Sequence, residues 1–260
     1  MNSTTYHARR YTTIVRIVYW NIRAGGGKRL DWIVEQLAAW EPDVVGLCEF
    51  RGTPASQALA DHIKQLGLLH QRTALLPERP ATNGLLLASR WPLKSIRTAT
   101  KPPERERWLI ARVKDGPAVG VIHAPNFVTG KKRAFFDAVA ALASRWRGGP
   151  AVFGGDTNTG VPPIDGNPAA FHPWEYEWVH GLAKAGWADA FRHLHGQRQE
   201  HSWYSPNAGN GYRLDQAYIN RGLVRRLVGA RYQWGTARGA PNKRHALSDH
   251  AALILEIGAG

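Results

Sequence analysis

A carboxylate and an amide, Asp156 and Asn158, follow the apolar run 152–155, which ends in two glycines. Glycine at a strand end permits a sharp turn and a close backbone approach, and the i, i+2 spacing puts both side chains on one side of an extended chain. Such a carboxylate can orient or deprotonate water, and a neutral amide can hold that carboxylate or a phosphate oxygen. The pair indicates a phosphoryl site at a buried strand tip, although these residue types also form ordinary turns.

Polar side chains stand at the ends of other predicted strands as well. Runs of β-branched and apolar residues predict strands over 13–20, 43–49, 117–122, 213–219 and 251–257. The polar residues at or beside their ends are Asn21, Glu49, His123, Asn126, Asp215, Asp249 and His250. Singly, each is ordinary, since a histidine is often structural and an Asp can cap a turn. Together they offer oxygen ligands for a hard cation, a base, and imidazoles that stabilise charge, and they predict one hydrolase site.

The elements that must position these residues follow from hydrophobic periodicity. Apolar residues at helical spacing predict a helix over 30–40, and similar patterns predict helices over 55–66, 134–145 and 175–185. Further strands are predicted over 69–75, 84–89, 92–99, 106–113, 201–205 and 229–235. Many strands with few helices predict an α/β (α+β) fold of two packed sheets, with helices outside and the site at one rim. The segment 160–173 is long for a connection, which favours a functional loop.

Length and composition favour one large domain. The chain has 260 residues, and we expect a single domain over 13–260 behind a flexible basic tail over 1–12. Hydrophobic content of 43% argues against disorder, and no apolar run approaches the ~20 residues of a membrane helix. Cys48 is the lone cysteine and cannot form an intrachain disulfide, which fits a reducing cytoplasm.

The net charge of +14 points to a polyanionic partner, although solubility alone is a simpler explanation. The basic residues lie in short clusters, which favours a surface groove over a disordered arm. These clusters are Lys131-Lys132-Arg133, 145–147 and 238–244.

Five motifs resemble those of the endonuclease/exonuclease/phosphatase superfamily, and they occur in the same order. They are Trp20-Asn21, the strand-ending Glu49, Gly155-Asp156 with Asn158, Arg213 with Asp215, and Ser248-Asp249-His250. The resemblance spans nearly the whole chain. It implies a four-layered sandwich of two packed mixed β-sheets flanked by helices, and an enzyme that cleaves phosphoester bonds with a divalent metal, usually Mg²⁺, for which Mn²⁺ can substitute.

The resemblance also implies roles for individual residues. Glu49 resembles the principal metal ligand, assisted by Asn21 and Asp249. Asp156 resembles the residue that positions or activates water, and Asn158 resembles the residue that supports both this carboxylate and the phosphate. Asp215 is similar to the carboxylate that fixes the tautomer of a histidine, here His250, which contacts the scissile phosphate.

Within the superfamily, residues 171–215 resemble the exonuclease III and abasic-site endonuclease branch. Two positions depart from that branch. His123 stands where the branch has a tyrosine, and a histidine there resembles the acid of the deoxyribonuclease I and phosphodiesterase branches. Arg23 stands where abasic-site endonucleases have an acidic metal ligand.

These observations predict a Mg²⁺-dependent DNA phosphodiesterase, endo- or exonucleolytic, with abasic sites among its candidate substrates. The alternative is a phosphatase or phosphodiesterase of the same fold that acts on a small phosphorylated substrate or a phospholipid headgroup. A catalytically inactive nucleic-acid-binding module is a third possibility, which the full set of site residues opposes. We expect DNA as the partner, no membrane association, and a monomer.

Substrate contacts are expected from residues around the Asp215 and Asp249 segments. Trp203 lies in an alternating strand and is expected to be the most buried of the aromatic candidates, whereas Phe171 and Trp174 border the long loop and are expected to stack on bases. The full set is Asn126, Arg213, Phe171, Trp174, Trp203, Lys243 and Arg244.

Overall fold

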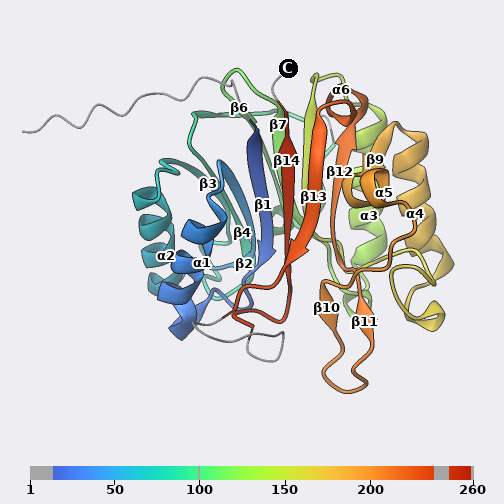
Figure 1. Cartoon of the computed structure of the whole chain (residues 1–260), viewed down its shortest axis with the longest axis horizontal. Helices are drawn as coiled ribbons and strands as arrows, with labels where there is room; N and C mark the ends of the chain where they lie inside the picture. Colours follow the sequence, from blue (N-terminus) through green and yellow to red (C-terminus); the bar gives the residue numbers. More distant parts are fainter. Residues whose placement is uncertain (1–13, 99, 237–245, 259–260) are drawn as a thin grey trace, which may run out of the picture.

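Two mixed β-sheets lie face to face with helices on both outer faces (Figure 1). This computed structural model describes residues 14–98, 100–236 and 246–258. Helices α1 (Leu30–Trp40) and α2 (Pro54–Gln65) cover the first sheet, and α3 (Lys132–Ser144) and α4 (Pro173–Lys184) cover the second. The predicted sandwich is confirmed.

The first sheet has six strands in the order β13-β14-β1-β2-β4-β3. In this sheet β1 and β2 are parallel, and their neighbours pair antiparallel. The strand bounds are β1 (Val15–Asn21), β2 (Val44–Phe50), β3 (His70–Ala74), β4 (Gly84–Ser89), β13 (Leu227–Gln233) and β14 (Ala252–Ile257).

The second sheet has six strands in the order β5-β6-β7-β8-β12-β9. Again one central pair, β7 and β8, is parallel while the others are antiparallel. The bounds are β5 (Leu93–Ser95), β6 (Trp108–Val113), β7 (Ala118–His123), β8 (Ala151–Asp156), β9 (Trp187–Asp189) and β12 (Asp215–Asn220).

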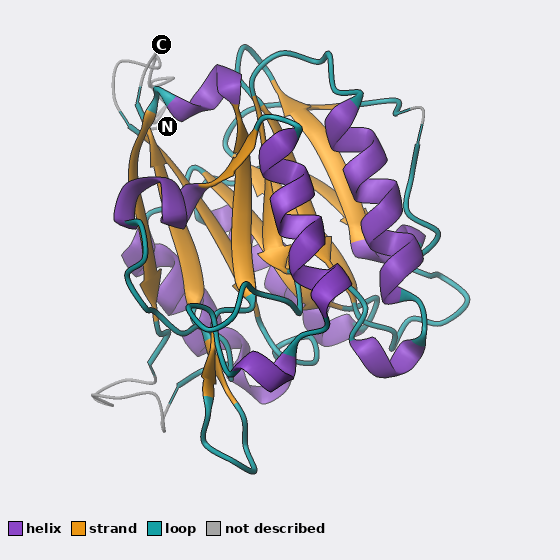
Figure 2. Ribbon diagram, turned by 90° about the vertical axis from the view of Figure 1, so that its right-hand side faces the viewer, coloured by secondary structure: helices purple, strands orange, loops and turns teal. Residues whose placement is uncertain are grey.

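Three apolar clusters hold the layers together. One fills the space between the sheets, and the other two lie under the outer helix pairs. Figure 2 shows the long helices α3 and α4 lying across the outer face of the second sheet. Local sequence fixes the helix ends, since Thr53 accepts a hydrogen bond from the Ser56 backbone at the start of α2 and Glu41 takes a left-handed conformation after α1.

The strand order brings the polar strand ends to one edge, the lower edge in Figure 1. Parallel strands β1, β2, β7 and β8 all finish at this edge, while β12 and β14 run the other way and begin there. In the register of the second sheet, Asp156 pairs with His123 on one side and with Asp215 on the other. This is the geometric reason why residues far apart in sequence share one rim.

Several short elements were not predicted. Each has six residues or fewer, too few to show a hydrophobic period. They are helices α5 (Ala190–His195) and α6 (Arg221–Val224) and strands β9 and β11 (Gly211–Tyr212). Strand β11 pairs with β10 (Trp203–Tyr204). The β10–β11 hairpin projects beyond the body at the polar rim (Figure 1). Single-turn 3₁₀ helices cover Gly27–Arg29 (η1), Arg105–Arg107 (η2), Phe127–Thr129 (η3) and Pro168–Ala170 (η4).

Other predicted bounds shift. The strand predicted over 92–99 is only β5, the one predicted over 201–205 is the two-residue β10, and α3 begins at Lys132 rather than 134. The expected tail over 1–12 lies outside the described residues. Within the described ranges, no helix combines the length and apolar character needed to cross a membrane.

Candidate active site

Asp156 lies at the end of β8 and is only 2% exposed. Gly155 before it has φ 136°, and a Cβ there would meet the Ile122 carbonyl oxygen at 2.2 Å and Cys48 Sγ at 2.9 Å. Glycine is therefore required for β8 to approach its neighbours this closely at the strand end. The close backbone approach predicted for the glycines is found at Gly155, whereas a Cβ at Gly154 would meet the side chains of Tyr19 and Ala217.

Four groups surround the Asp156 carboxylate. Asn21 Nδ2 donates to Oδ2 at 3.1 Å, and the Asn158 backbone N–H donates to Oδ1 at 2.9 Å. His123 Nε2 and His250 Nε2 lie 3.6 Å and 3.8 Å from Oδ2. Since Asn21 and His250 come from the first sheet and its border while the others come from the second, the carboxylate sits where the two sheets meet.

Asn158 does not follow the extended geometry expected from its spacing. Its φ is 51°, so the chain turns after Asp156, and its side-chain Nδ2 donates to the Ala124 carbonyl at 2.8 Å. The Asn158 amide group therefore braces the end of β7, and this residue supports Asp156 through its backbone N–H instead.

Lys132 is a residue whose role the sequence did not indicate. It was expected in a surface groove, yet it is 3% exposed, and its ammonium donates to the Asn158 carbonyl at 2.6 Å and pairs with Glu175. A buried charge needs such partners, and these three link α3, α4 and the turn after β8. The sequence Lys131-Lys132-Arg133 gives no sign that the middle residue is buried and the other two are exposed.

His250 is bound to Asp215 through Nδ1 and Oδ2 at 2.8 Å. The Trp20 indole donates to the His250 carbonyl at 3.0 Å, and Ser202 Oγ accepts from the Asp215 backbone N–H, which fixes both residues. Burial opposes protonation, but the carboxylates of Asp215 and Asp156 outweigh it and raise the pKa of His250 to about 10. His250 is thus an imidazolium at neutral pH, with its Nε2–H toward Asp156.

Burial, followed by the charge of Asp215, raises the pKa of Asp156 to about 6, although the His250 charge opposes the shift. The carboxylate is therefore mostly ionised at neutral pH but more basic than an exposed aspartate. A base with a pKa near the working pH is suited to accept a proton from water.

The pKa of His123 is shifted in the opposite direction to that of His250. Burial first, and then the charges of Arg107 and His250, lower its pKa well below the ordinary value, and its Nδ1 is buried without a hydrogen-bond partner. The imidazole is therefore neutral at neutral pH. The expected acid role requires this ring to gain a proton when an anionic substrate enters.

Glu49 owes its direction to a β-bulge. The β2–β4 register shifts between Cys48 and Phe50, and Glu49 between them has φ 61°. Its Oε2 accepts from the Ala24 N–H at 2.7 Å and its Oε1 from Asn21 Nδ2 at 3.3 Å. Each carboxylate oxygen keeps a lone pair for another partner, because an ionised carboxylate offers about four acceptor sites.

Asn21 differs from its expected role as an oxygen ligand. Its Oδ1 accepts from the Arg23 N–H at 3.0 Å, and its nitrogen faces Glu49 and Asp156. The amide thus joins the two carboxylates as a donor. Asp249 is exposed and lies 3.4 Å from the Ser248 hydroxyl, which donates to the Asn21 carbonyl at 2.6 Å.

Glu49 bonds the Asn21 amide, and Asp249 follows Ser248, whose hydroxyl bonds the Asn21 carbonyl. Both are hard oxygen donors of the kind that suits Mg²⁺, an ion that commonly takes one or two protein carboxylates. Across the described ranges, the only His, Cys, Asp and Glu side chains that gather in a group of three or more with ligand atoms within 4.8 Å are Asp156, Asp215 and His250. That group holds a protonated imidazole already bound to Asp215, so its geometry suits proton handling rather than metal ligation.

Arg29 is a second residue that the sequence did not single out. Its guanidinium donates to the carbonyls of Ile22 and Leu247, which ties the end of β1 to the Ser248–His250 segment. Burial and the charge of Arg23 lower its pKa, while Asp249 and Glu49 partly offset this shift. The Arg29 charge therefore lies within range of both expected metal ligands.

Two of the expected substrate residues are buried. Arg213 is 1% exposed and binds the carboxylates of Asp165 and Asp189 at 2.6 Å each, so the expectation that it binds substrate is wrong. Phe171 is 8% exposed and packs edge-on against Tyr212, which contradicts its predicted stacking on bases. In both cases the partners that bury the side chain are distant in sequence.

The burial of the other aromatic candidates also differs from the expected order. Trp203 is half-buried rather than the most buried, and its ring centroid is 6.4 Å from that of His250. Trp174 is half-buried as well and packs against Phe136. Asn126 is exposed just after β7, whereas Lys243 and Arg244 lie outside the described residues.

The model of the Endonuclease/Exonuclease/phosphatase family matches residues 18–250, from β1 to His250. The chain belongs to this family. It is accordingly a hydrolase of phosphoester bonds, and the resemblance seen in the motifs is confirmed. Among curated proteins, none matches the sequence.

Three solved structures share the fold of the family. A 3′ phosphatase from Neisseria bound to a product DNA hairpin is 21% identical, with a TM-score of 0.77 over 94% of this chain and 99% of that one. A 3′–5′ exonuclease from Neisseria meningitidis is 20% identical, with a TM-score of 0.78 over 94% and 100%. An AP endonuclease from Archaeoglobus fulgidus is 19% identical, with a TM-score of 0.77 over 94% and 99%.

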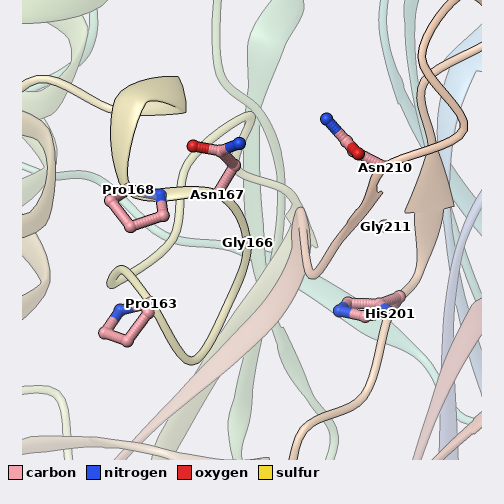
Figure 3. A pocket seen from close by; sticks show the side chains of 7 residues that line it. All are labelled: Pro163, Gly166, Asn167, Pro168, His201, Asn210 and Gly211. Carbon is pink, nitrogen blue, oxygen red and sulfur yellow. The ribbon is translucent and has the colours of Figure 1, made fainter.

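A surface pocket of about 290 Å³ lies between the loop that follows β8 and the β10–β11 hairpin. In Figure 3 the side chains of Asn167, Asn210 and His201 face this space from its two sides. None of the residues that surround Asp156 lines it. The pocket is thus separate from the group of residues around Asp156.

Proposed function

We propose that the protein is a divalent-metal-dependent phosphodiesterase that hydrolyses DNA phosphodiester bonds by attack of water on phosphorus. One observation carries the proposal: a buried, ionised Asp156 of raised pKa faces the Nε2 of His250, a protonated histidine that Asp215 holds in place. A base and a fixed cation that face one point are what attack by water on a phosphate requires.

In this proposal Asp156 accepts the proton of the attacking water, since Asn21 and Asn158 hold the carboxylate by both oxygens. His250 donates its Nε2–H to a phosphate oxygen and stabilises the negative charge that develops there. Asp215 keeps the imidazole oriented and charged. His123, neutral before substrate binds, takes a proton from solvent in the field of the phosphate and passes it to the leaving oxygen as the P–O bond breaks.

Glu49 and Asp249 are the residues that would hold Mg²⁺, or Mn²⁺ in its place, and Asn21 orients Glu49 through its amide nitrogen. When bound, the ion supplies Lewis-acid stabilisation of the phosphate and the leaving oxygen. Arg29 adds positive charge near the same carboxylates.

DNA is the substrate that we favour because the chain carries a net charge of +14, which suits a polyanion. The fold is shared with a 3′ phosphatase, a 3′–5′ exonuclease and an AP endonuclease, which supports DNA without choosing among these reactions. Removal of a phosphate from a DNA 3′ end is a second candidate, favoured by the similarity to the Neisseria 3′ phosphatase.

The test is to incubate the purified protein with Mg²⁺ and labelled duplex, single-stranded, abasic and 3′-phosphate DNA, beside a small phosphodiester and an inositol phosphate. A chelator and the Asp156→Asn variant serve as the two controls. We expect hydrolysis of at least one DNA and its loss in both controls. Hydrolysis of only the small substrates would overturn the DNA proposal and support the alternative of the same fold.

A further inference from the structure

An aromatic ledge lies on the surface directly after the catalytic strand β7. We define it as Phe127, His172 and Trp174. Phe127 is 52% exposed, and its ring stacks on that of His172 with centroids 4.3 Å apart and planes inclined by 29°. The His172 and Trp174 rings are nearly parallel, at 10° with centroids 6.4 Å apart. Exposed aromatic side chains that cluster in this way, rimmed by polar residues, are a feature of binding sites.

Positive charge flanks the ledge. The Arg133 guanidinium lies over the Trp174 ring, 5.7 Å from its centroid, and both Arg133 and its neighbour Lys131 are exposed. Aromatic faces for bases beside cations for phosphates are the combination by which proteins bind single-stranded nucleic acid. A purely apolar protein partner would not need these cations.

The ledge is fixed relative to the catalytic group. The His172 backbone N–H donates to Glu175 at 2.8 Å, Glu175 pairs with Lys132, and Lys132 donates to the Asn158 carbonyl at 2.6 Å. The Asn158 N–H in turn bonds Asp156. An unbroken chain of polar contacts therefore joins the ledge to the catalytic carboxylate.

Its distance from the chemistry is also bounded. Phe127 follows His123 by four residues, so their Cα atoms lie at most about 14 Å apart. Successive nucleotides of one strand rise by about 3.4 Å, so a base stacked on Phe127 would lie within about four nucleotides of a phosphate held at His123. A base stacked on Phe127 would belong to the strand segment beside the cleaved bond.

We propose that this ledge stacks an unpaired nucleobase next to the scissile phosphate, and that the enzyme thereby favours DNA with a single-stranded extension beside the cleaved bond. The inference rests on the proposed DNA function and adds a substrate form to it. In a fully paired duplex the bases stack on each other, so the exposed face of Phe127 finds no partner.

The test measures DNA affinity of Phe127→Ala in an Asp156→Asn background, which prevents cleavage. The probes are a blunt duplex, the same duplex with an extension of about four nucleotides at either end, and one whose extension lacks bases but keeps its phosphates. Val128→Ala is the matched control, because Val128 is 86% exposed in the same loop but has no ring. Phe127→Trp tests whether a second aromatic ring restores binding.

We expect Phe127→Ala to weaken binding of the base-bearing extension by at least about fivefold, with the blunt and base-less probes, Val128→Ala and Phe127→Trp close to the parent. The melting temperature should not change, since the ring is exposed. Equal affinities of Phe127→Ala and its parent for every probe, or equal losses of affinity on all three probes, would refute base stacking on the ledge. Neither result would contradict the proposal that the wild type hydrolyses DNA. A wild type that neither binds nor hydrolyses DNA would instead sink the proposed function itself.

Discussion

At the scale of single residues, the site depends on one carboxylate whose surroundings raise its pKa without neutralising it. We expect Asp156→Asn to abolish nearly all turnover, because the amide cannot accept a proton, while DNA binding stays largely intact. Steady-state rates with Mg²⁺ and binding assays on the same DNA would measure both. Asp137→Asn, an exposed carboxylate on α3, is the matched control and should behave as wild type. Comparable turnover in Asp156→Asn and wild type would refute the role of Asp156 as the base that accepts the proton of water.

The metal-ligand expectation can be tested at Glu49. Glu49→Gln removes one negative charge and keeps the shape of the side chain, although the amide retains only one of the two oxygens that accept from Ala24 and Asn21. We expect a higher Mg²⁺ concentration for half-maximal activity, because Mg²⁺ binding depends strongly on carboxylate charge. A Mg²⁺ titration of activity measures this, and the exposed Glu177→Gln on α4 is the control. An unchanged Mg²⁺ requirement in Glu49→Gln would place the ion elsewhere.

His250 should keep its proton to unusually high pH. Because the carboxylates of Asp215 and Asp156 raise its pKa to about 10, the imidazolium is present below that pH and is lost as pH rises through it. In Asp215→Asn one of these charges is gone, so we expect the pKa of His250 to fall by about 1 unit or more. NMR titration of the histidine ring nitrogens, without added metal, would follow both proteins. A His250 that titrates near 6.5 in wild type would contradict the ion pair.

At the scale of elements, the long strands and helices could be predicted from the sequence because their periodicity extends over enough residues. The strand ends that carry Glu49, Asp156 and Asp215 followed from the same pattern. The short α5, β9 and β11 could not be predicted, since they are too brief to show a period.

Individual side chains were harder to place than the strands that carry them. Phe171 was expected to contact substrate because it borders the long loop 160–173, and Arg213 because it lies two residues before Asp215. The partners that bury Arg213 are Asp165 and Asp189, and they lie 48 and 24 residues away. The side-chain direction of Asn158 was predicted wrongly, because the hydrophobic pattern of a sequence does not show a left-handed φ at a non-glycine residue.

The buried pair Lys132–Glu175 makes a testable link between elements. Removing one partner leaves an uncompensated buried charge, so Lys132→Met and Glu175→Gln should each cost about 3–5 kcal/mol in the free energy of unfolding. The double variant should lose less than the sum of the two. Lys64→Met, which removes the exposed pair with Asp61, should cost less than about 1 kcal/mol. Chemical denaturation of the four variants gives these values, and additive losses would show that the pair is not coupled.

At the scale of the whole molecule, the net charge of +14 has two explanations. It keeps the protein soluble, or it forms a surface along which a polyanion binds. The polar rim, where the β10–β11 hairpin projects and the candidate catalytic residues meet, is the edge at which such a path would arrive (Figure 1). Lys243 and Arg244 precede Asp249 in sequence, and they are the cations that we expect to contact phosphates there.

Replacing Lys243 and Arg244 together by alanine should weaken every DNA substrate alike. Each phosphate contact releases close to one counterion, so the slope of log affinity against log salt concentration should flatten by about one to two units. Lys94 and Lys114 provide the control pair, because they lie at the far end of the second sheet, beside the turn between β6 and β7. Their double replacement should leave the slope unchanged, since exposed charges more than about 10 Å from the DNA are screened at ordinary salt. An unchanged slope in the Lys243 and Arg244 variant would move the DNA path away from this segment, and a wild type whose binding does not depend on salt would favour a small substrate over DNA.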